Sequence, residues 1–472
     1  MIKNEREYRI TRSQAESFEG ALQQLGAKSA ADDPIVSLQR RAMQSQLDDL
    51  IDELADYTAL REGRVSVLRV SSFDELPTAL IRARIAAGLT QKELAERLAL
   101  APQQVQRYEA NDYATASLAR IQQIARVLGV AVREEVFLPG VDVSMSALRG
   151  RLKKAGVDPT FFTRRLFNES ADEENDAQTA LRAGDVVSRI FGWSSVDIFA
   201  GSSPLKVATF AGAPRYKLPA TAQATRTDVL TAYARFVAEI AVKGTPETSG
   251  DPIPTSASGL LRELGSPDSI RLSTLLDYLW SRGVPVVPLA ESGGFHGAFW
   301  RINGRSAIVL KQKTASEARW MHDLLHEMYH VACHTEERDY EMLEGETGMH
   351  GAVDQKEEQR ATKFAGNVLL GNRAEELAEE SVRDCSGRLQ WLKRSVPAVA
   401  KRNSVRVDVL ANYMAYRLAL QGENWWGAAN NLQPPGSPWE DAREFLLGHV
   451  QTAMLESSER HLLRLALLDM GA

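Results

Sequence analysis

Apolar residues recur at helical spacing along most of the chain, which predicts a mainly helical protein. Over residues 1–63 they form one stripe with charged residues opposite, as in a pair of amphipathic helices. The stripe consists of Leu38, Met43, Leu47, Leu50, Ile51, Leu54 and Tyr57. Such a face serves a dimer contact or packing within the chain equally well. The next run, Arg64–Val70, has the pattern of a short strand.

Three further regions extend the helical pattern. Residues 140–245 are mostly helical in their periodicity, and Val407–Leu420 and Trp439–Leu468 are amphipathic segments near the C-terminal end. The Trp pair that follows Leu420 is interpreted as core packing. A stretch rich in Pro, Ser, Thr and Gly, Lys243–Gly259, predicts a linker or a flexible surface loop, and is a candidate site of self-cleavage.

Composition is typical of a globular protein of several domains. The chain has 472 residues, of which 44% are hydrophobic and 25% charged. At about 100–200 residues per domain, this length predicts three or four units. No run is apolar enough to span a membrane, and the first residues are too polar for a signal peptide. We therefore expect no contact with membranes. The two cysteines, Cys333 and Cys385, lack zinc-finger spacing, so we expect free thiols in a reducing cytoplasm.

The most specific motif is His-Glu-Met-Tyr-His at residues 326–330, within the helical run Ala315–His334. Two His four residues apart share one face of a helix, so both imidazoles reach one metal ion. The Glu directly after the first His then lies beside a metal-bound water and accepts its proton. The motif predicts a zinc peptidase with Glu327 as the general base. The alternative is a polar helix that carries surface histidines.

Four of the eight His residues form a stripe at a strict spacing of four: His322, His326, His330 and His334. A helix rises about 1.5 Å per residue, so His326 and His334 lie too far apart to share a zinc ion with bonds of about 2.1 Å. Only the pair His326 and His330 has a Glu after its first member, and we assign these two as ligands. We expect His322 and His334 to be outer or surface residues.

A catalytic zinc takes three protein ligands and leaves one position to water. Residues 336–346 are rich in acids but poorly periodic and contain Gly, which predicts a solvated loop. From Asp354 the helical pattern returns. Glu357 and Glu358 both border its apolar stripe, and periodicity does not choose between them as the third ligand.

The segment Glu358–Leu370 resembles the E-x-x-A-N-x-F-A-x-x-L-L motif of the ImmA/IrrE metallopeptidase family. Upstream, Gly283–Leu289 and Ala307–Leu310 resemble the strands of that family, so the likeness covers residues 280–371. It implies an α+β, zincin-like metallopeptidase domain with a small sheet. It also implies that Glu358 is the third zinc ligand.

Two positions depart from the motif of that family. Thr362 stands where Asn is usual, and Leu370-Gly371 stands where Met-Pro is usual. We expect neither departure to touch a ligand. The departures therefore concern the substrate more than the metal.

A second specific pattern occupies residues 76–130, where short helices are joined by tight turns. Thr90 and Glu93 have the spacing of a capping box, and Pro102 stands in the first turn of the next helix. Two short helices joined by such a turn form a helix-turn-helix, whose second helix enters the DNA major groove. The segment resembles the XRE (lambda-repressor-like) class in its Gly-Leu-Thr-Gln start and its Arg-Tyr-Glu-Ala end.

The second helix of this unit carries residues that are suited to reading bases. Gln pairs with adenine and Arg with guanine in the major groove, so Gln103, Gln104 and Arg107 are candidate base contacts. We expect Gln91 to contact a phosphate or to brace Gln103. Seven basic residues against four acidic ones leave the segment at +3, whereas the whole chain carries −6. The alternative is a protein-binding role for this fold.

The metal motif predicts a hydrolytic chemistry. Zinc held by His326, His330 and Glu358 lowers the pKa of its water toward about 7 and polarises the scissile carbonyl. Glu327 removes the water proton and passes it to the leaving amine. We expect the substrate to lie extended along an edge strand, with His296–Ile302 as the candidate strand.

Together these patterns predict a mainly α multidomain protein, in which a lambda-repressor-like helix-turn-helix bundle joins a zinc peptidase domain. The expected units are an N-terminal arm (1–70), an XRE-type DNA-binding domain (71–135), a helical middle region with a linker (136–258), an ImmA/IrrE-type domain (259–375) and a helical extension (376–472). We expect a homodimeric regulator that binds operator DNA and cleaves a protein substrate, another repressor or the chain itself. Two alternatives stay open: a metallopeptidase toxin or phage-defence effector with an autoregulatory helix-turn-helix, and a regulator whose peptidase fold senses a ligand without cutting.

Overall fold

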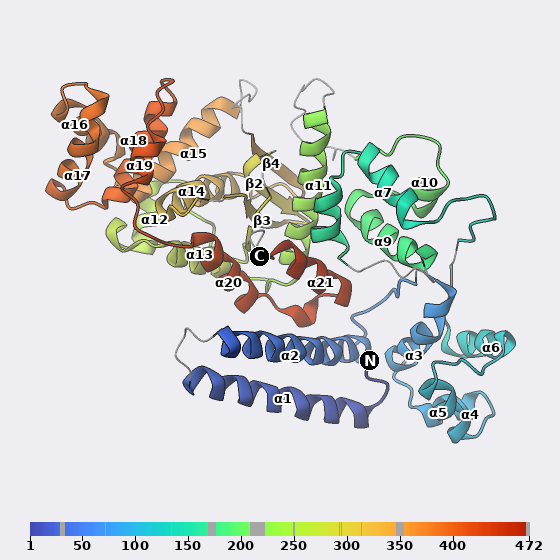
Figure 1. Ribbon diagram of the computed structural model, residues 1–472. Helices are drawn as coiled ribbons and strands as arrows, with labels where there is room; N and C mark the ends of the chain where they lie inside the picture. Colours follow the sequence, from blue (N-terminus) through green and yellow to red (C-terminus); the bar gives the residue numbers. More distant parts are fainter. Residues whose placement is uncertain are drawn as a thin grey trace.

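The computed structural model describes residues 1–28, 34–70, 72–133, 135–168, 176–207, 222–248, 251–291, 293, 295–312, 314–345 and 354–468 (Figure 1). Helices predominate in this part of the chain, as the periodicity predicts, and four strands form a mixed sheet. Within it, no helix has both the length and the apolar character that crossing a membrane requires.

The N-terminal arm is a hairpin of two long helices, α1 (Glu5–Lys28) and α2 (Pro34–Arg61), which confirms the predicted helix pair (Figure 1). The predicted apolar stripe is buried only toward the end of α2, where Leu47 and Tyr57 are buried, whereas Leu38 is exposed. Residues 64–70 were wrongly predicted as a strand. They form a connection outside the sheet, because a strand needs a neighbour that pairs with its backbone.

The head follows the arm and consists of a one-turn helix, η1, and the four helices α3 to α6. Their bounds are Phe73–Glu75 for η1, Leu76–Ala86 for α3, Gln91–Arg97 for α4, Pro102–Ala110 for α5 and Leu118–Leu128 for α6. Leu80, Ile81 and Leu94 are almost completely buried between these helices. Tyr57 and Leu60 of α2 belong to the same core, so the arm and the head pack as one unit.

The body is built around the sheet. Its strands are β1 (Val286–Pro288), β2 (Phe295–Ile302), β3 (Arg305–Leu310) and β4 (Tyr340–Gly345), in the order β1-β3-β2-β4. β1 runs parallel to β3, and β2 runs antiparallel to both β3 and β4. β2 is therefore paired on both sides, and its prediction as the edge strand for substrate was wrong.

β4 lies where the sequence predicted a solvated loop. The acidic residues of this segment suggested exposure, but Glu341 is buried on the sheet. Its carboxylate accepts a hydrogen bond from Trp300 Nε1 across the β2–β4 pair, at 3.1 Å. Because an acidic residue is buried and paired here, the segment lacks the alternation of apolar and polar residues by which a strand is recognised in a sequence.

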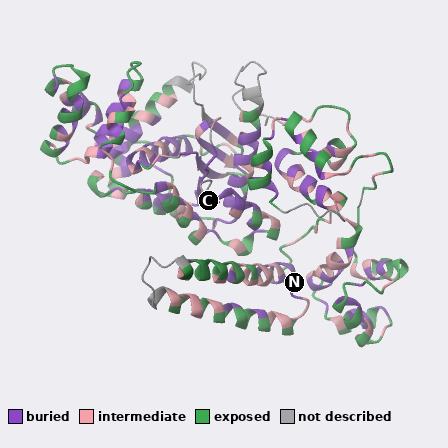
Figure 2. Ribbon diagram, viewed as in Figure 1, coloured by how far each residue is buried: buried purple, intermediate pink, exposed green. Residues whose placement is uncertain are grey.

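Alternate residues of the strands face two separate hydrophobic cores. Phe299, Ile308 and Leu310 face the helices on one side of the sheet, and Trp300 and Val309 face those on the other. The first side consists of α12 (Ala257–Leu264), η3 (Pro267–Ser269), α13 (Leu272–Ser281), α14 (Glu317–Cys333), α15 (Asp354–Leu369), α16 (Ala374–Asp384), η4 (Leu389–Trp391), α17 (Leu392–Arg402), α18 (Val407–Ala419) and α19 (Trp426–Asn430). Figure 2 shows the buried residues concentrated around the sheet and these helices.

The second side is formed by helices from both ends of the body. It consists of α7 (Met145–Lys154), α8 (Pro159–Phe161), a π turn (Phe162–Leu166), α9 (Asp176–Phe191), α10 (Ser195–Phe199), α11 (Ala222–Lys243) and α21 (Ser457–Ala466), while α20 (Pro438–His449) contributes to both cores and η5 (Thr452–Met454) connects the last two helices. The predicted helices over 140–245 and the C-terminal pair are confirmed. Trp425 is buried in the first core, as predicted.

The segment Lys243–Gly259, predicted as a linker or a flexible loop, is anchored in its described part. Thr245 is buried, and Ile253 belongs to the first hydrophobic core. Arg305 donates a hydrogen bond to the carbonyl oxygen of Thr245 at 2.6 Å. Residues typical of linkers also form tight connections whose carbonyls are bonded to the body, and that is the case here.

The arm also docks on the body. Arg460 of α21 is buried, and it contacts Asp52 at 2.8 Å and Asp56 at 2.6 Å on α2. Arg464 contacts Asp52 at 2.6 Å. The arm therefore packs within the chain, one of the two roles its sequence left open, and its role in a dimer stays a prediction.

Candidate functional site

Helix α14 carries the His-Glu-Met-Tyr-His motif through the centre of the body. Ser316 caps its first turn by accepting a hydrogen bond from the backbone N–H of Arg319. Three polar residues of the motif are buried deeply, with 3% of His326, 1% of Glu327 and 1% of His330 exposed. Because burial of polar groups costs free energy unless they are matched, these residues need polar partners or a ligand.

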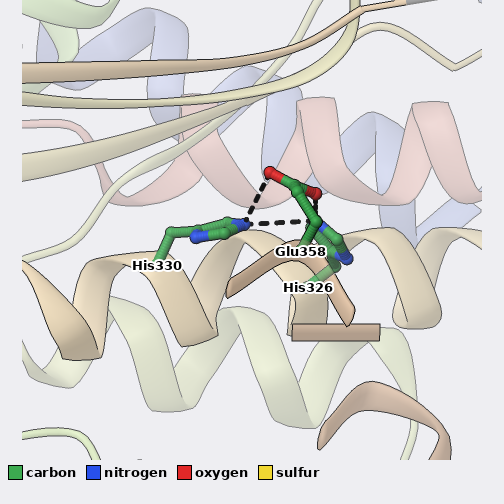
Figure 3. Close-up of side chains that lie close together, drawn as sticks. All are labelled: His326, His330 and Glu358. Carbon is green, nitrogen blue, oxygen red and sulfur yellow. Dashed lines mark hydrogen bonds and ion pairs between the residues drawn. The ribbon is translucent and has the colours of Figure 1, made fainter. Parts of the chain in front are cut away.

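The three expected ligands converge in the structure (Figure 3). His326 Nε2 lies 3.0 Å from Glu358 Oε2, and His330 Nε2 lies 3.2 Å from His326 Nε2. The other carboxylate oxygen, Glu358 Oε1, lies 3.5 Å from His330 Nε2. The two imidazoles from α14 and the carboxylate from α15 thus point at one small volume.

The neighbouring Glu357 faces the other nitrogen of His330. Its Oε1 lies 2.8 Å from His330 Nδ1 and 2.9 Å from His334 Nε2. Hydrogen bonds from His330 and His334 hold the pKa of Glu357 well below its usual range. An ionised carboxylate only accepts hydrogen bonds, so His330 Nδ1 carries the proton. Glu357 and Glu358 thus contact different nitrogens of His330, although the helical periodicity did not distinguish them.

This arrangement fits a cation. Burial lowers the pKa of His330, so its imidazole is neutral near pH 7. With the proton on Nδ1, the lone pair of His330 Nε2 faces His326 and Glu358. Two imidazole nitrogens and one carboxylate are a usual donor set for a catalytic zinc, which keeps a fourth position for water. Two groups of described residues have atoms close enough to share one ion: His326, His330 and Glu358, and His330, His334 and Glu357. The first group contains both His residues of the motif.

The two outer histidines of the stripe support this group. His334 is half-buried between Glu357 and Glu337, and its hydrogen bond to Glu357 raises its pKa. His322 is buried beside Asp323 and packs its ring against Tyr416, with 5.3 Å between ring centroids. Neither is a surface residue. The stripe of four His residues thus faces α15 and α18, which both pack against α14.

Glu327 lies against the backbone of β2 at Gly297. A methyl group at Gly297 would come within 3.0 Å of Glu327 Cδ and 3.2 Å of Glu327 Cγ. Glycine in a strand often marks a close approach of another group. Gly297 therefore provides the space in which the expected base stands, and no motif in the sequence indicated this role.

Thr362 corrects another expectation. We expected the departures from the family motif to touch no ligand, but Thr362 Oγ1 lies 3.4 Å from His326 Nδ1. It also lies 3.2 Å from the hydroxyl of Tyr416 on α18. Helical spacing from Glu358 to Thr362 was the available signal for the first contact. The sequence holds no comparable signal for Tyr416.

The head presents the second candidate site on α5. A full capping box starts α4, since Thr90 accepts a hydrogen bond from the N–H of Glu93 and donates its own N–H to that side chain. Pro102 occupies the first turn of α5, as predicted. Gln103 and Arg107 are exposed on α5, and so is Gln106, which was not among the predicted base contacts.

The two other Gln residues are occupied inside the head. Gln104 donates to the hydroxyl of Tyr108 at 3.0 Å. Gln91 donates to Glu109 at 2.9 Å, so in this structure it braces the end of α5 and not Gln103. Glu109 also accepts hydrogen bonds from Arg84 at 2.6 and 2.8 Å in a buried ion pair. The exposed polar residues of α5 are thus Gln103, Gln106 and Arg107.

Comparison with known protein families supports the interpretation of the head as a helix-turn-helix. Residues 80–134 match the family model described as Helix-turn-helix. This segment is a helix-turn-helix. The match supports a DNA-binding regulator, and it covers the head alone. No curated protein and no solved structure matches the chain.

Proposed function

We propose that this DNA-binding regulator also carries a zinc-dependent endopeptidase. The observation that carries the proposal is the convergence of His326, His330 and Glu358 beside the buried Glu327. The fold around them, a small mixed sheet covered by the motif helix, agrees with the resemblance of residues 280–371 to ImmA/IrrE metallopeptidases. Burial of a polar group of this kind is costly, and binding an ion gives a reason for it.

The residues have distinct roles in this proposal. His326, His330 and Glu358 would hold zinc, which when bound acidifies a water and polarises the scissile carbonyl. Glu327 accepts a proton from the attacking water and passes it to the leaving amine. Glu357 orients His330 through its Nδ1 and keeps the Nε2 lone pair directed at the site.

An extended substrate has to use a strand edge. β4 forms an edge of the sheet beside β2, which carries Gly297 over Glu327, whereas β1 lies on the far side of β3. We therefore place the substrate along β4, where its backbone would add a strand to the sheet. Gln103, Gln106 and Arg107 would read operator DNA from the head.

Comparison of protein N-termini in cells tests the peptidase. Cells would carry the wild-type protein, Glu327→Gln or Glu336→Gln, the last as a control at an exposed Glu beyond the end of α14. We expect new N-termini with wild type and Glu336→Gln but none with Glu327→Gln. Identical N-termini in all three strains would contradict the proposal.

Two other results would redirect it. Toxicity that Glu327→Gln relieves would indicate an effector whose helix-turn-helix only regulates its own operon. A reporter response that is unchanged in Glu327→Gln would indicate a regulator that senses a ligand and does not cut.

A further inference from the structure

We propose that Tyr416 and Thr362 form a hydrogen-bonded relay that orients His326 as a metal ligand. The helical extension after residue 375 would then complete the metal centre as well as pack against it. This inference rests on the proposed zinc site. Thr362 lies at a departure from the family motif, and Tyr416 lies outside the segment that resembles the family.

The relay joins three helices. His326 lies on α14, Thr362 on α15 and Tyr416 on α18, and α14 packs against both of the others. Thr362 Oγ1 lies 3.4 Å from His326 Nδ1 and 3.2 Å from Tyr416 Oη. The Tyr416 ring also packs against the buried ring of His322, which restricts its orientation.

The Thr362 hydroxyl is suited to the tautomer of His326 that metal binding requires. Thr362 Oγ1 has one proton and two lone pairs. Whether Tyr416 donates to Thr362 or accepts from it, Oγ1 keeps a lone pair for an Nδ1–H donor. When Nε2 of His326 binds the metal, the ring proton is on Nδ1, and this lone pair of Oγ1 accepts a hydrogen bond from it. A hydrogen bond from the second ring nitrogen is the usual way in which proteins orient a metal-bound His.

The two histidines have different partners on that second nitrogen. His330 donates to the ionised Glu357 at 2.8 Å, whereas His326 Nδ1 contacts the uncharged hydroxyl of Thr362, which in turn contacts the hydroxyl of Tyr416. A Thr side chain is shorter than the Asn usual at this position of the motif. Tyr416 reaches in from α18 and supplies the second polar contact that the hydroxyl needs for a fixed direction.

Zinc affinity of the purified full-length protein tests the relay. The metal would be removed, and zinc would be returned in competition with a chromogenic chelator. Thr362→Val keeps the shape of the side chain but removes its hydroxyl, and we expect about 10- to 100-fold weaker zinc binding. Thr362→Ser restores the hydroxyl and should return the affinity to near the wild-type value. Tyr416→Phe should weaken binding by about 2- to 10-fold, since it removes one uncharged hydrogen bond.

Tyr413→Phe is the matched control on the same helix. The Tyr413 hydroxyl donates to Glu375 at 2.6 Å, away from the metal centre, so its loss should leave zinc affinity unchanged. The double variant Thr362→Val/Tyr416→Phe should bind zinc no more weakly than Thr362→Val, because Tyr416 acts through Thr362.

The outcomes separate the relay from the zinc site itself. Wild-type affinity in both Thr362→Val and Tyr416→Phe would overturn the relay, and so would equal losses in Tyr416→Phe and Tyr413→Phe. Additive losses in the double variant would show that Tyr416 acts independently of Thr362, which also overturns it. A wild-type protein that binds no zinc would instead overturn the proposed function.

Discussion

The head and the candidate metal centre hold their functional side chains in opposite ways. Gln103 and Arg107 stand exposed on a surface helix, whereas His326, Glu327 and His330 are at most 3% exposed. DNA is large and contacts the protein at its surface, so the side chains that contact bases in the groove must be exposed. A metal ion is small, and its ligands act best where water is limited and neighbouring groups fix their direction.

Buried charges in the two regions differ as well. In the head, Arg84 and Glu109 neutralise each other, and Gln91 completes that contact. In the candidate metal centre, two imidazole nitrogens and a carboxylate lie 3.0 to 3.5 Å from one another. The ion pair gives the first group a structural role, whereas under our proposal the second group binds an ion.

The largest expected effect is that of Glu327→Gln. The substitution keeps the shape of the side chain but removes the base, so cleavage of the substrate found in cells should slow by about 10²- to 10⁴-fold. Zinc content and DNA affinity should stay unchanged, as the ligands and the head are untouched. Cleavage at the wild-type rate would remove Glu327 from the mechanism.

Breaking the buried ion pair of the head should destabilise it strongly. Glu109→Ala leaves Arg84 buried without its carboxylate, at a cost of about 3–5 kcal/mol in the free energy of unfolding. Glu96→Ala, which loses an exposed ion pair with Lys92, is the control and should change little. Thermal unfolding and DNA affinity measure the effect, and zinc binding should survive. Equal stability of the two variants would contradict the structural role of Glu109.

Gly297→Ala should separate the base from the metal ligands. The added methyl group would displace the Glu327 carboxylate, and a displacement of about 1 Å lowers the rate by about 10²-fold. Zinc content should stay at the wild-type level. Gly427→Ala, which adds a methyl group in open space on α19, is the control. Full cleavage by Gly297→Ala would show that Glu327 does not depend on that space.

Arg107→Ala should weaken DNA binding and nothing else. Loss of one bidentate base contact costs about 1–3 kcal/mol of discrimination against the wrong base. Gln104→Ala should lose less, because the Gln104 amide is held by Tyr108. Binding to operator variants, measured by gel shift, distinguishes the two. A larger loss of specificity in Gln104→Ala would reverse our assignment of the exposed face of α5.

Local features were predictable because their causes lie within a few residues. The capping box of Thr90 and Glu93, Pro102 in the first turn of α5 and the extent of α14 are confirmed. Helical spacing also placed His326 and His330 on one face. The two members of the capping box, and the two His residues, lie about one turn apart along their helices.

Features that depend on distant segments were missed or wrong. Strand order decides that β2 is central, and no local pattern encodes that order. The acidic run hid β4, because Glu341 is buried with Trp300 as its partner. Gly297 and Tyr416 join the site through tertiary packing, and their spacing in the sequence carries no sign of it.

Zinc content of the purified protein tests the central claim most directly. We predict about one zinc per chain, measured by elemental mass spectrometry, and its loss in His326→Ala and Glu358→Ala. Glu327→Gln and Arg107→Ala should keep the metal, since neither residue is a ligand. A wild-type protein without zinc, or with zinc that survives both ligand substitutions, would contradict the metal centre and the peptidase with it.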